Sequence, residues 1–173
     1  MPRSSALRVA PLKAAAAVRP QPPMRPFTDS LPMALLKARE SVMRRFRPGL
    51  RAHAVTEQQW RVLRALSGLG PLEITELAAR TCLLPPSLSR ILPSLESRGL
   101  VVRRGVVADL RRTAVSVTAA GLALIAAHAP QSEGVYRAIE ERFGAERLGQ
   151  LSRLLDELEA ALAPPAARGH TVR

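Results

Sequence analysis

The chain has 173 residues, 47% of them hydrophobic, which is enough for one domain with a sizeable core and some additional length. Its 26 Lys and Arg against 14 Asp and Glu give a formal net charge of +12, which favours a polyanionic partner, either nucleic acid or an anionic membrane surface. Aromatic residues make up only 3%, which argues against a single-strand binder that stacks bases on aromatic rings. The one cysteine excludes an intramolecular disulfide framework, and the dispersed histidines predict no metal site.

The ends of the chain differ in composition from its middle. Residues 1–30 are rich in Ala, Pro and Arg and are expected to be a disordered basic extension, and residues 164–173 a disordered tail. A transit peptide is an alternative for the extension, and translation can also begin at Met24 or Met33. No apolar run approaches the roughly 20 residues of a membrane helix, so we expect a soluble cytoplasmic protein with no membrane partner.

Helical spacing of apolar residues predicts the first elements of the ordered part. A first helix is expected over about residues 31–47 and ends at Pro48. Thr56 and Gln59 have the spacing of a capping box, in which each side chain bonds the other residue's backbone N–H, and they predict the start of a second helix. A short third helix is expected over about residues 73–80.

A fourth helix is predicted to begin at the Pro85-Pro86 pair, because proline is tolerated in a first helical turn. Its apolar residues have the i, i+3, i+4, i+7 spacing of a buried stripe: Leu88, Ile91, Leu92 and Leu95. Pro93 removes the hydrogen bond to the carbonyl of Ser89, so we expect it to kink the helix or to cost about 3 kcal/mol.

Two short β segments, over about residues 100–104 and 114–118, predict a hairpin after this helix. Together they predict a mainly α fold with a small β-hairpin wing, a winged helix-turn-helix over about residues 55–118. A helix fits the major groove of DNA, and serines and arginines off its core face can bond base edges or phosphates. The helix residues expected to contact DNA are Ser87, Ser89, Arg90, Ser94 and Arg98. Arginines on the hairpin suit phosphates or the minor groove: Arg103, Arg104, Arg111 and Arg112.

The C-terminal part is predicted to be helical. A fifth helix is expected from Thr118 to His128, before Pro130, and a last helical region follows it. Leucines near the end form a heptad seam with one more beside it: Leu148, Leu151, Leu155, Leu158, Leu162 and Leu154. Their spacing fits an intramolecular core equally well, but the terminal position of these helices favours a homodimer, with dimerisation helices over about residues 31–47 and 119–163.

The stretch from Leu72 to Thr118 resembles the MarR family of winged-helix regulators. The helix-turn-helix pattern of that family is similar to ELAART followed by PSLSRILPSLESRGLV, and its wing signature to DLRRTAVSVT. In the family, an Asp pairs with an Arg to shape the tip of the wing, and the Arg enters the minor groove. The resemblance implies these roles for Asp109 and Arg111.

A closer resemblance, over residues 31–163, is to MarR-family regulators of homoprotocatechuate-degradation operons. LLKARESVMRRFRP, VTEQQWRVL and YRAIEERFGAERLGQLSRLLDEL carry it. It implies a homodimer on double-stranded operator DNA, with recognition helices about one duplex turn apart. The function implied is repression of an operon for hydroxyphenylacetate catabolism, with release by a small aromatic acid effector.

An aromatic acid needs an apolar slot and a cation for its carboxylate. Arg39 and Trp60 are the leading candidates for binding it, and Arg64 and His53 are weaker ones. A surface ion pair with Glu40 is the alternative for Arg39, and plain core packing is the alternative for Trp60.

Three other functions are less well supported. Some MarR relatives sense oxidants through one cysteine, but we expect Cys82 to be buried and inert in the turn before the fourth helix. A nonspecific architectural DNA-binding or RNA-binding protein would fit the charge but not the wing. No phosphate loop, metal cluster or nucleophile with a base is evident, so neither an enzyme nor a cofactor is expected.

Overall fold

The computed structural model describes residues 24–106 and 109–163, and for Val106 and residues 109–112 it describes the backbone alone. The chain divides into two units after Glu40. The N-terminal unit contains a 3-10 turn, Phe27–Asp29, and the beginning of helix α1 (Leu31–Ala52). Several large apolar side chains of this unit are exposed: Met24, Phe27, Leu31, Leu35 and Leu36.

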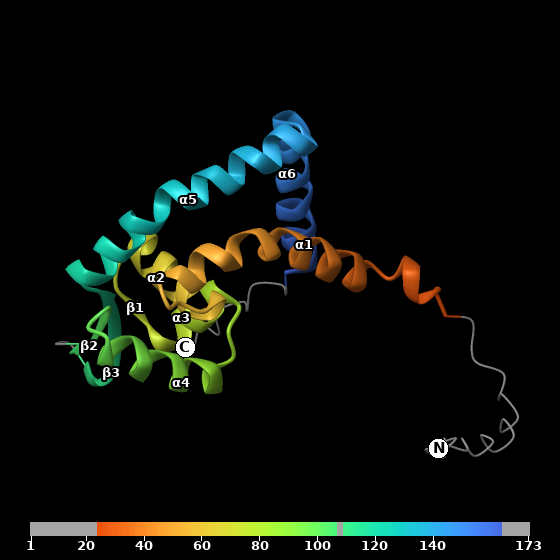
Figure 1. Ribbon diagram of the computed structural model, residues 1–173. Helices are drawn as coiled ribbons and strands as arrows, with labels where there is room; N and C mark the ends of the chain where they lie inside the picture. The colour runs from red at the N-terminus through yellow and green to blue at the C-terminus, as the bar shows by residue number, and fades with distance from the viewer. Residues whose placement is uncertain (1–23, 107–108, 164–173) are drawn as a thin grey trace, which may run out of the picture. The chain divides into compact units, whose positions relative to one another are not determined.

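The second unit contains the end of α1 and all later elements (Figure 1). In chain order these are α2 (Glu57–Leu69), β1 (Leu72–Glu73), α3 (Ile74–Thr81), α4 (Pro85–Ser97), β2 (Val101–Val106), β3 (Asp109–Val117), α5 (Ala119–Phe143) and α6 (Ala145–Leu162). The predicted fold class, mainly α with a small β-hairpin wing, is confirmed. None of the helices in the described ranges is both long enough and apolar enough to cross a bilayer.

The strands form an antiparallel sheet in the order β1-β3-β2. In the predicted hairpin, Val101 lies opposite Val117, and both strands run further toward the tip than their apolar patterns indicated. The two-residue strand β1 adds a third strand, with Leu72 opposite Val115. Its shortness explains why no alternating pattern predicted it.

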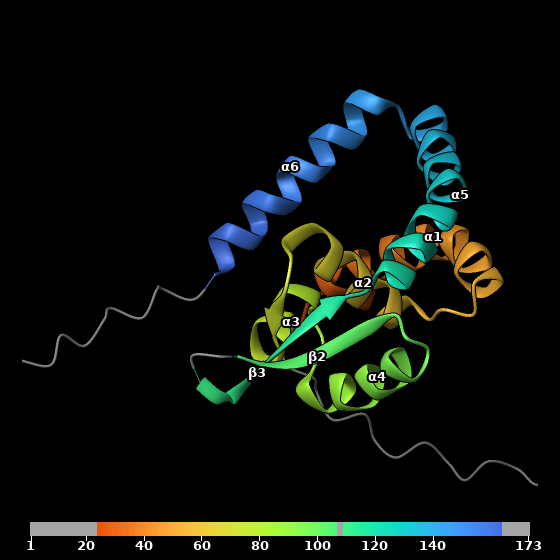
Figure 2. The ribbon, with the colours of Figure 1, turned by 90° about the vertical axis from the view of Figure 1, so that its left-hand side faces the viewer.

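A hydrophobic core joins α2, α3 and α4 to the sheet, and the predicted stripe of α4 lies in it. Its four members are at most 7% exposed: Leu88, Ile91, Leu92 and Leu95. Fully burying such a side chain stabilises a protein by about 1.5–3 kcal/mol. The stripe therefore fixes α4 against the body of the domain and leaves its other face available (Figure 2).

The predicted capping box at the start of α2 is present. Gln59 donates its backbone N–H to the Thr56 hydroxyl at 3.2 Å, and Thr56 donates its own to the Gln59 side chain at 3.0 Å. The turn between α3 and α4 is held by Arg61, which donates to the carbonyl of Thr81 at 2.8 Å. The bond from Arg61 therefore ties the end of α3 to α2, just before the turn that leads into α4.

The helix ends predicted from proline are wrong in two places. Helix α1 continues through Pro48 and α5 through Pro130, and α4 likewise remains one helix through Pro93. All three prolines are exposed, so water can bond the carbonyls that lose their N–H partners. Buried Leu50 and Leu95 follow two of these prolines, and burying them favours continuing the helix.

The first turn of α5 lies close to the start of the wing. The Thr118 hydroxyl accepts the backbone N–H of Gly121 at 3.1 Å and donates to the carbonyl of Gly99 at 2.6 Å. A Cβ on Gly121 would stand 2.3 Å from the carbonyl oxygen of Leu100. Glycine is therefore required for this approach of α5 to the sheet.

Candidate nucleic-acid interface and effector site

The N-terminal half of α4 presents small polar and basic side chains away from the core. Ser89 and Arg90 are exposed and Ser87 is half-buried. Ser89 donates to the carbonyl of Pro85 at 3.2 Å, while Arg90 has no ion-pair partner in the described part of the chain. Arg90 is thus free to bind a base or a phosphate without first breaking an internal bond.

The C-terminal half of α4 is bonded to the protein instead. Ser94 accepts a hydrogen bond from the side-chain amide of Gln59 at 3.1 Å. Arg98, which caps the end of α4, donates to the carbonyl of Ala54 at 2.7 Å and to that of His53 at 3.2 Å. No local pattern marks these bonds, because their partners lie 35 to 45 positions earlier in the chain.

The two arginines on β2 differ in their surroundings. Arg103 forms an ion pair with Glu96 of α4 at 2.5 Å, and its hydrogen bond to that carboxylate raises the pKa of the guanidinium. Arg104 is exposed and lies opposite Ala114, on the other face of the strand from Arg103. Arg104 is therefore the more available of the two to an anion.

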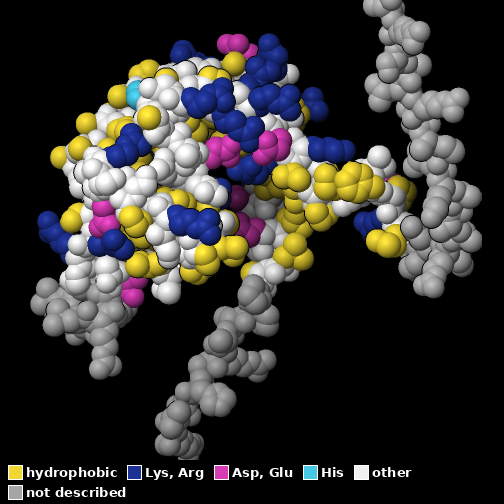
Figure 3. Space-filling model, turned by 60° about the horizontal axis from the view of Figure 1, so that its bottom comes forward, with side chains coloured by type: hydrophobic (Ala, Val, Ile, Leu, Met, Phe, Trp, Pro, Cys, Tyr) yellow, Lys and Arg dark blue, Asp and Glu magenta, His cyan; other side chains and the backbone are white. Residues whose placement is uncertain are grey.

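Part of the predicted wing contact set falls outside the described side chains. Asp109, Arg111 and Arg112 belong to β3 by their backbone, but their side chains are not among those described. Figure 3 shows several Lys and Arg side chains gathered at the upper right of one face, and others at separate places on it.

Two of the predicted effector residues meet around a buried histidine of α5. The ring of Trp60 lies edge-on to that of His128, with centroids 4.6 Å apart, and the ring of His53 lies 5.4 Å from it. His128 is 1% exposed, and neither of its nitrogens has a hydrogen-bond partner in the described structure. Burial, and then the nearby His53, lower the pKa of His128, which favours the neutral imidazole.

The two predicted cations lie in different settings. Arg39 is in the N-terminal unit and bonds the Glu40 carboxylate at 2.8 Å, which is the ion pair anticipated as its alternative role. Arg64 is exposed on α2, one helical turn after Trp60. Residues four apart on a helix share a face, so Arg64 and Trp60 lie on the same side of α2.

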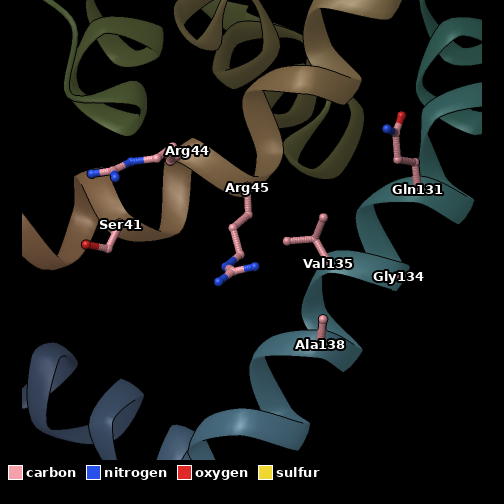
Figure 4. A pocket seen from close by; sticks show the side chains of 7 residues that line it. All are labelled: Ser41, Arg44, Arg45, Gln131, Gly134, Val135 and Ala138. Carbon is pink, nitrogen blue, oxygen red and sulfur yellow. The ribbon is translucent and has the colours of Figure 1, made fainter.

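A second aromatic pair and a cleft were not predicted from the sequence. Phe46 of α1 and Tyr136 of α5 meet edge to face, with centroids 5.1 Å apart. Between the same two helices lies an open cleft of about 810 Å³, lined by Ser41, Arg44, Arg45, Gln131, Gly134, Val135 and Ala138. In Figure 4, Arg45 extends from α1 toward α5 while Arg44 extends along α1. No motif marks these residues, because helices distant in the sequence build both features.

The expected burial of Cys82 is wrong, because its side chain is exposed. Cys82 follows α3 in the left-handed conformation, with φ of 50°, and its backbone N–H caps the carbonyls of the helix end. This conformation turns the side chain outward instead of into the turn.

Comparisons with known proteins agree with this architecture. The model of the MarR family matches residues 55–113. The homoprotocatechuate degradative operon repressor of Escherichia coli is 45% identical over 132 residues, which cover 76% of this chain and 89% of that protein.

Two solved structures are similar along most of their length. NadR in complex with 4-hydroxyphenylacetate is 40% identical with a TM-score of 0.69, covering 79% of this chain and 96% of that one. The transcriptional repressor CouR, bound to a 23-mer DNA duplex, is 25% identical with a TM-score of 0.70. The match covers 80% of this chain and 98% of that one.

Proposed function

This chain belongs to the MarR family, and we propose that it is a repressor of an operon for aromatic-acid catabolism that an aromatic acid releases from its operator. The observation that carries DNA binding is the N-terminal half of α4, where Arg90 is exposed and has no ion-pair partner in the described residues. The names of the relatives support the rest, since one represses a homoprotocatechuate operon and another was solved with 4-hydroxyphenylacetate.

DNA reading is assigned to the start of α4 and to the wing. Ser89 and Arg90 are proposed to contact base edges in the major groove, and Ser87 a phosphate. Arg104 on β2 is proposed to bind a phosphate at the edge of the site. Asp109 and Arg111 are proposed to shape the wing tip and to enter the minor groove, with Arg112 on a nearby phosphate.

The regulator is proposed to act as a homodimer. Helix α6 contains no buried residue, and even its leucines are exposed. Four of them are 40–72% exposed: Leu151, Leu154, Leu155 and Leu162. Leaving that much apolar surface in water is unfavourable, and a second copy of the helix would cover it. A twofold dimer presents two α4 helices to a palindromic operator.

The effector is proposed to bind beside the ring cluster of His53, Trp60 and His128. Trp60 supplies an aromatic ring to pack against an aromatic acid, and His53 supplies a polar edge. Arg64 is the proposed cation for the carboxylate.

Sequencing the DNA selected by the purified protein, with and without 4-hydroxyphenylacetate, tests this function. We expect a palindromic motif with half-sites about 10 base pairs apart, and its loss when the acid is present. A selected pool with no motif contradicts specific binding and supports the architectural alternative. A motif that persists at saturating acid contradicts release by this compound.

Oxidant sensing through Cys82 is the second candidate, because this side chain is exposed next to α4. Treating the protein with hydrogen peroxide and measuring operator affinity distinguishes the two. Oxidation supports sensing if it weakens binding by the wild type but not by Cys82→Ser. Equal affinities before and after treatment exclude it.

A further inference from the structure

The C-terminal half of α4 is tied to the segment that connects α1 with α2 and to the first turn of α2. Ser94 and Arg98 are four residues apart, so they lie on the same side of α4. Arg98 donates to the carbonyls of Ala54 and His53, and Gln59 donates to Ser94. We call these three hydrogen bonds the α4 clamp.

The segment that Arg98 holds has a defined, unfavourable conformation. Ala54 has φ of 52°, in the left-handed region that residues with a Cβ seldom adopt. Such a turn persists when its surroundings hold it. A planar guanidinium that bonds two successive carbonyls fixes both peptide groups, which a single flexible donor does not.

The same segment carries part of the proposed effector site. The backbone of His53 accepts from Arg98 while its ring packs 5.4 Å from His128. Gln59, which bonds Ser94, directly precedes Trp60, whose ring lies 4.6 Å from His128. Every bond of the clamp thus begins or ends within one residue of a ring in this cluster.

We propose that Arg98 is a positioning residue that couples occupancy of the effector site to the placement of α4 on DNA. This inference rests on the proposed function for its effector. A ligand that packs against Trp60 or bonds His53 shifts the segment between α1 and α2. A displacement on the order of 1 Å takes the carbonyls out of hydrogen-bond range of the guanidinium. Helix α4 then loses this support, and its operator-binding placement becomes less populated.

The test compares operator affinity with and without 4-hydroxyphenylacetate for each variant. The ratio of the two dissociation constants measures the coupling, and ratios of roughly 5 to 150 are usual for allosteric proteins. We expect the ratio of Arg98→Gln to fall toward 1 and that of Arg98→Lys to stay between those of Arg98→Gln and the wild type. Arg80→Gln, an exposed arginine of α3 that pairs only weakly with Glu76, is the matched control and keeps the wild-type ratio.

A direct DNA contact by Arg98 gives a different result. Arg98→Gln would then weaken binding with and without the acid by the same factor, and the unchanged ratio would overturn the proposal. Using the ratio removes any effect of the substitution on basal affinity.

A second measurement does not depend on the effector. Trp60 is the single tryptophan of the chain, so its emission reports the ring cluster alone. Because coupling is reciprocal, operator DNA should shift this emission in the wild type and in Arg80→Gln but not in Arg98→Gln. If 4-hydroxyphenylacetate does not change the operator affinity of the wild type, but operator DNA shifts Trp60 emission as expected in the three proteins, the proposed effector is wrong and the coupling is supported. If operator binding leaves Trp60 emission unchanged in the wild type, the coupling is wrong.

Discussion

Replacing Arg90 by Gln is expected to weaken operator binding while leaving the fold intact. Arg90 is exposed on α4 and has no ion-pair partner in the described residues, so its removal breaks no internal interaction. Substitutions at such surface positions usually change the free energy of unfolding by less than about 0.5 kcal/mol. An effect on DNA affinity therefore reports the interface and not folding.

The size of the effect follows from the proposed contact. A bidentate bond from Arg to guanine contributes about 1–3 kcal/mol of discrimination. Two copies in a dimer give about 2–6 kcal/mol, which corresponds to a loss of roughly 30-fold to 10⁴-fold in affinity. The loss on random DNA should be much smaller, since only the phosphate contacts remain there.

The assay is a mobility-shift titration on operator and on random duplex at one fixed salt concentration, with Arg80→Gln as the control variant. The control should match the wild type on both duplexes. A loss below about threefold for Arg90→Gln on the operator would refute base recognition by this residue. Equal losses on both duplexes would reassign Arg90 to a phosphate contact.

Three further predictions concern packing, titration and assembly. Gly121→Ala should lower the free energy of unfolding by about 1–3 kcal/mol in urea denaturation, because the added Cβ meets a backbone oxygen. In Gly134→Ala, on the same helix, the added Cβ meets nothing within 4 Å, so this change should raise the free energy of unfolding by about 0.5–1 kcal/mol. A Gly121→Ala variant more stable than Gly134→Ala would contradict the packing described. Because the pKa of His128 is lowered in the folded state, the unfolded imidazole gains its proton at a higher pH than the folded one, so wild-type stability should drop as pH falls below the ordinary value of 6.5. His128→Leu should show a shallower drop, and an identical pH profile would contradict the neutral buried state. Leu155→Glu should shift the protein from dimer to monomer in sedimentation velocity, and an unchanged dimer would exclude this face of α6 from the interface.

Local patterns predicted the elements that depend on neighbouring residues. The capping box at Thr56 and Gln59 formed because both partners lie within one turn of the helix start. The leucine stripe of α4 became buried because its spacing places four apolar side chains on one face. Both features can therefore be predicted from neighbouring residues, without information on the rest of the fold.

Features that depend on distant partners could not be predicted in this way. The breaks expected at Pro48 and Pro130 did not occur, since tertiary packing favoured longer helices than the local rule allows. Sequence spacing placed Ser94 and Arg98 on the outer face of α4 with the DNA contacts. Only the fold showed that they bond Gln59 and the segment before it.

Whether α4 and the wing read DNA sequence is tested most directly by the ratio of affinities for the selected operator and for random duplex. Measuring both dissociation constants across a salt series separates the sequence-specific part from phosphate binding. Specific reading predicts a ratio of roughly 10³ or more at physiological salt. A ratio near 1 at every salt concentration would contradict it and leave only charge-driven binding.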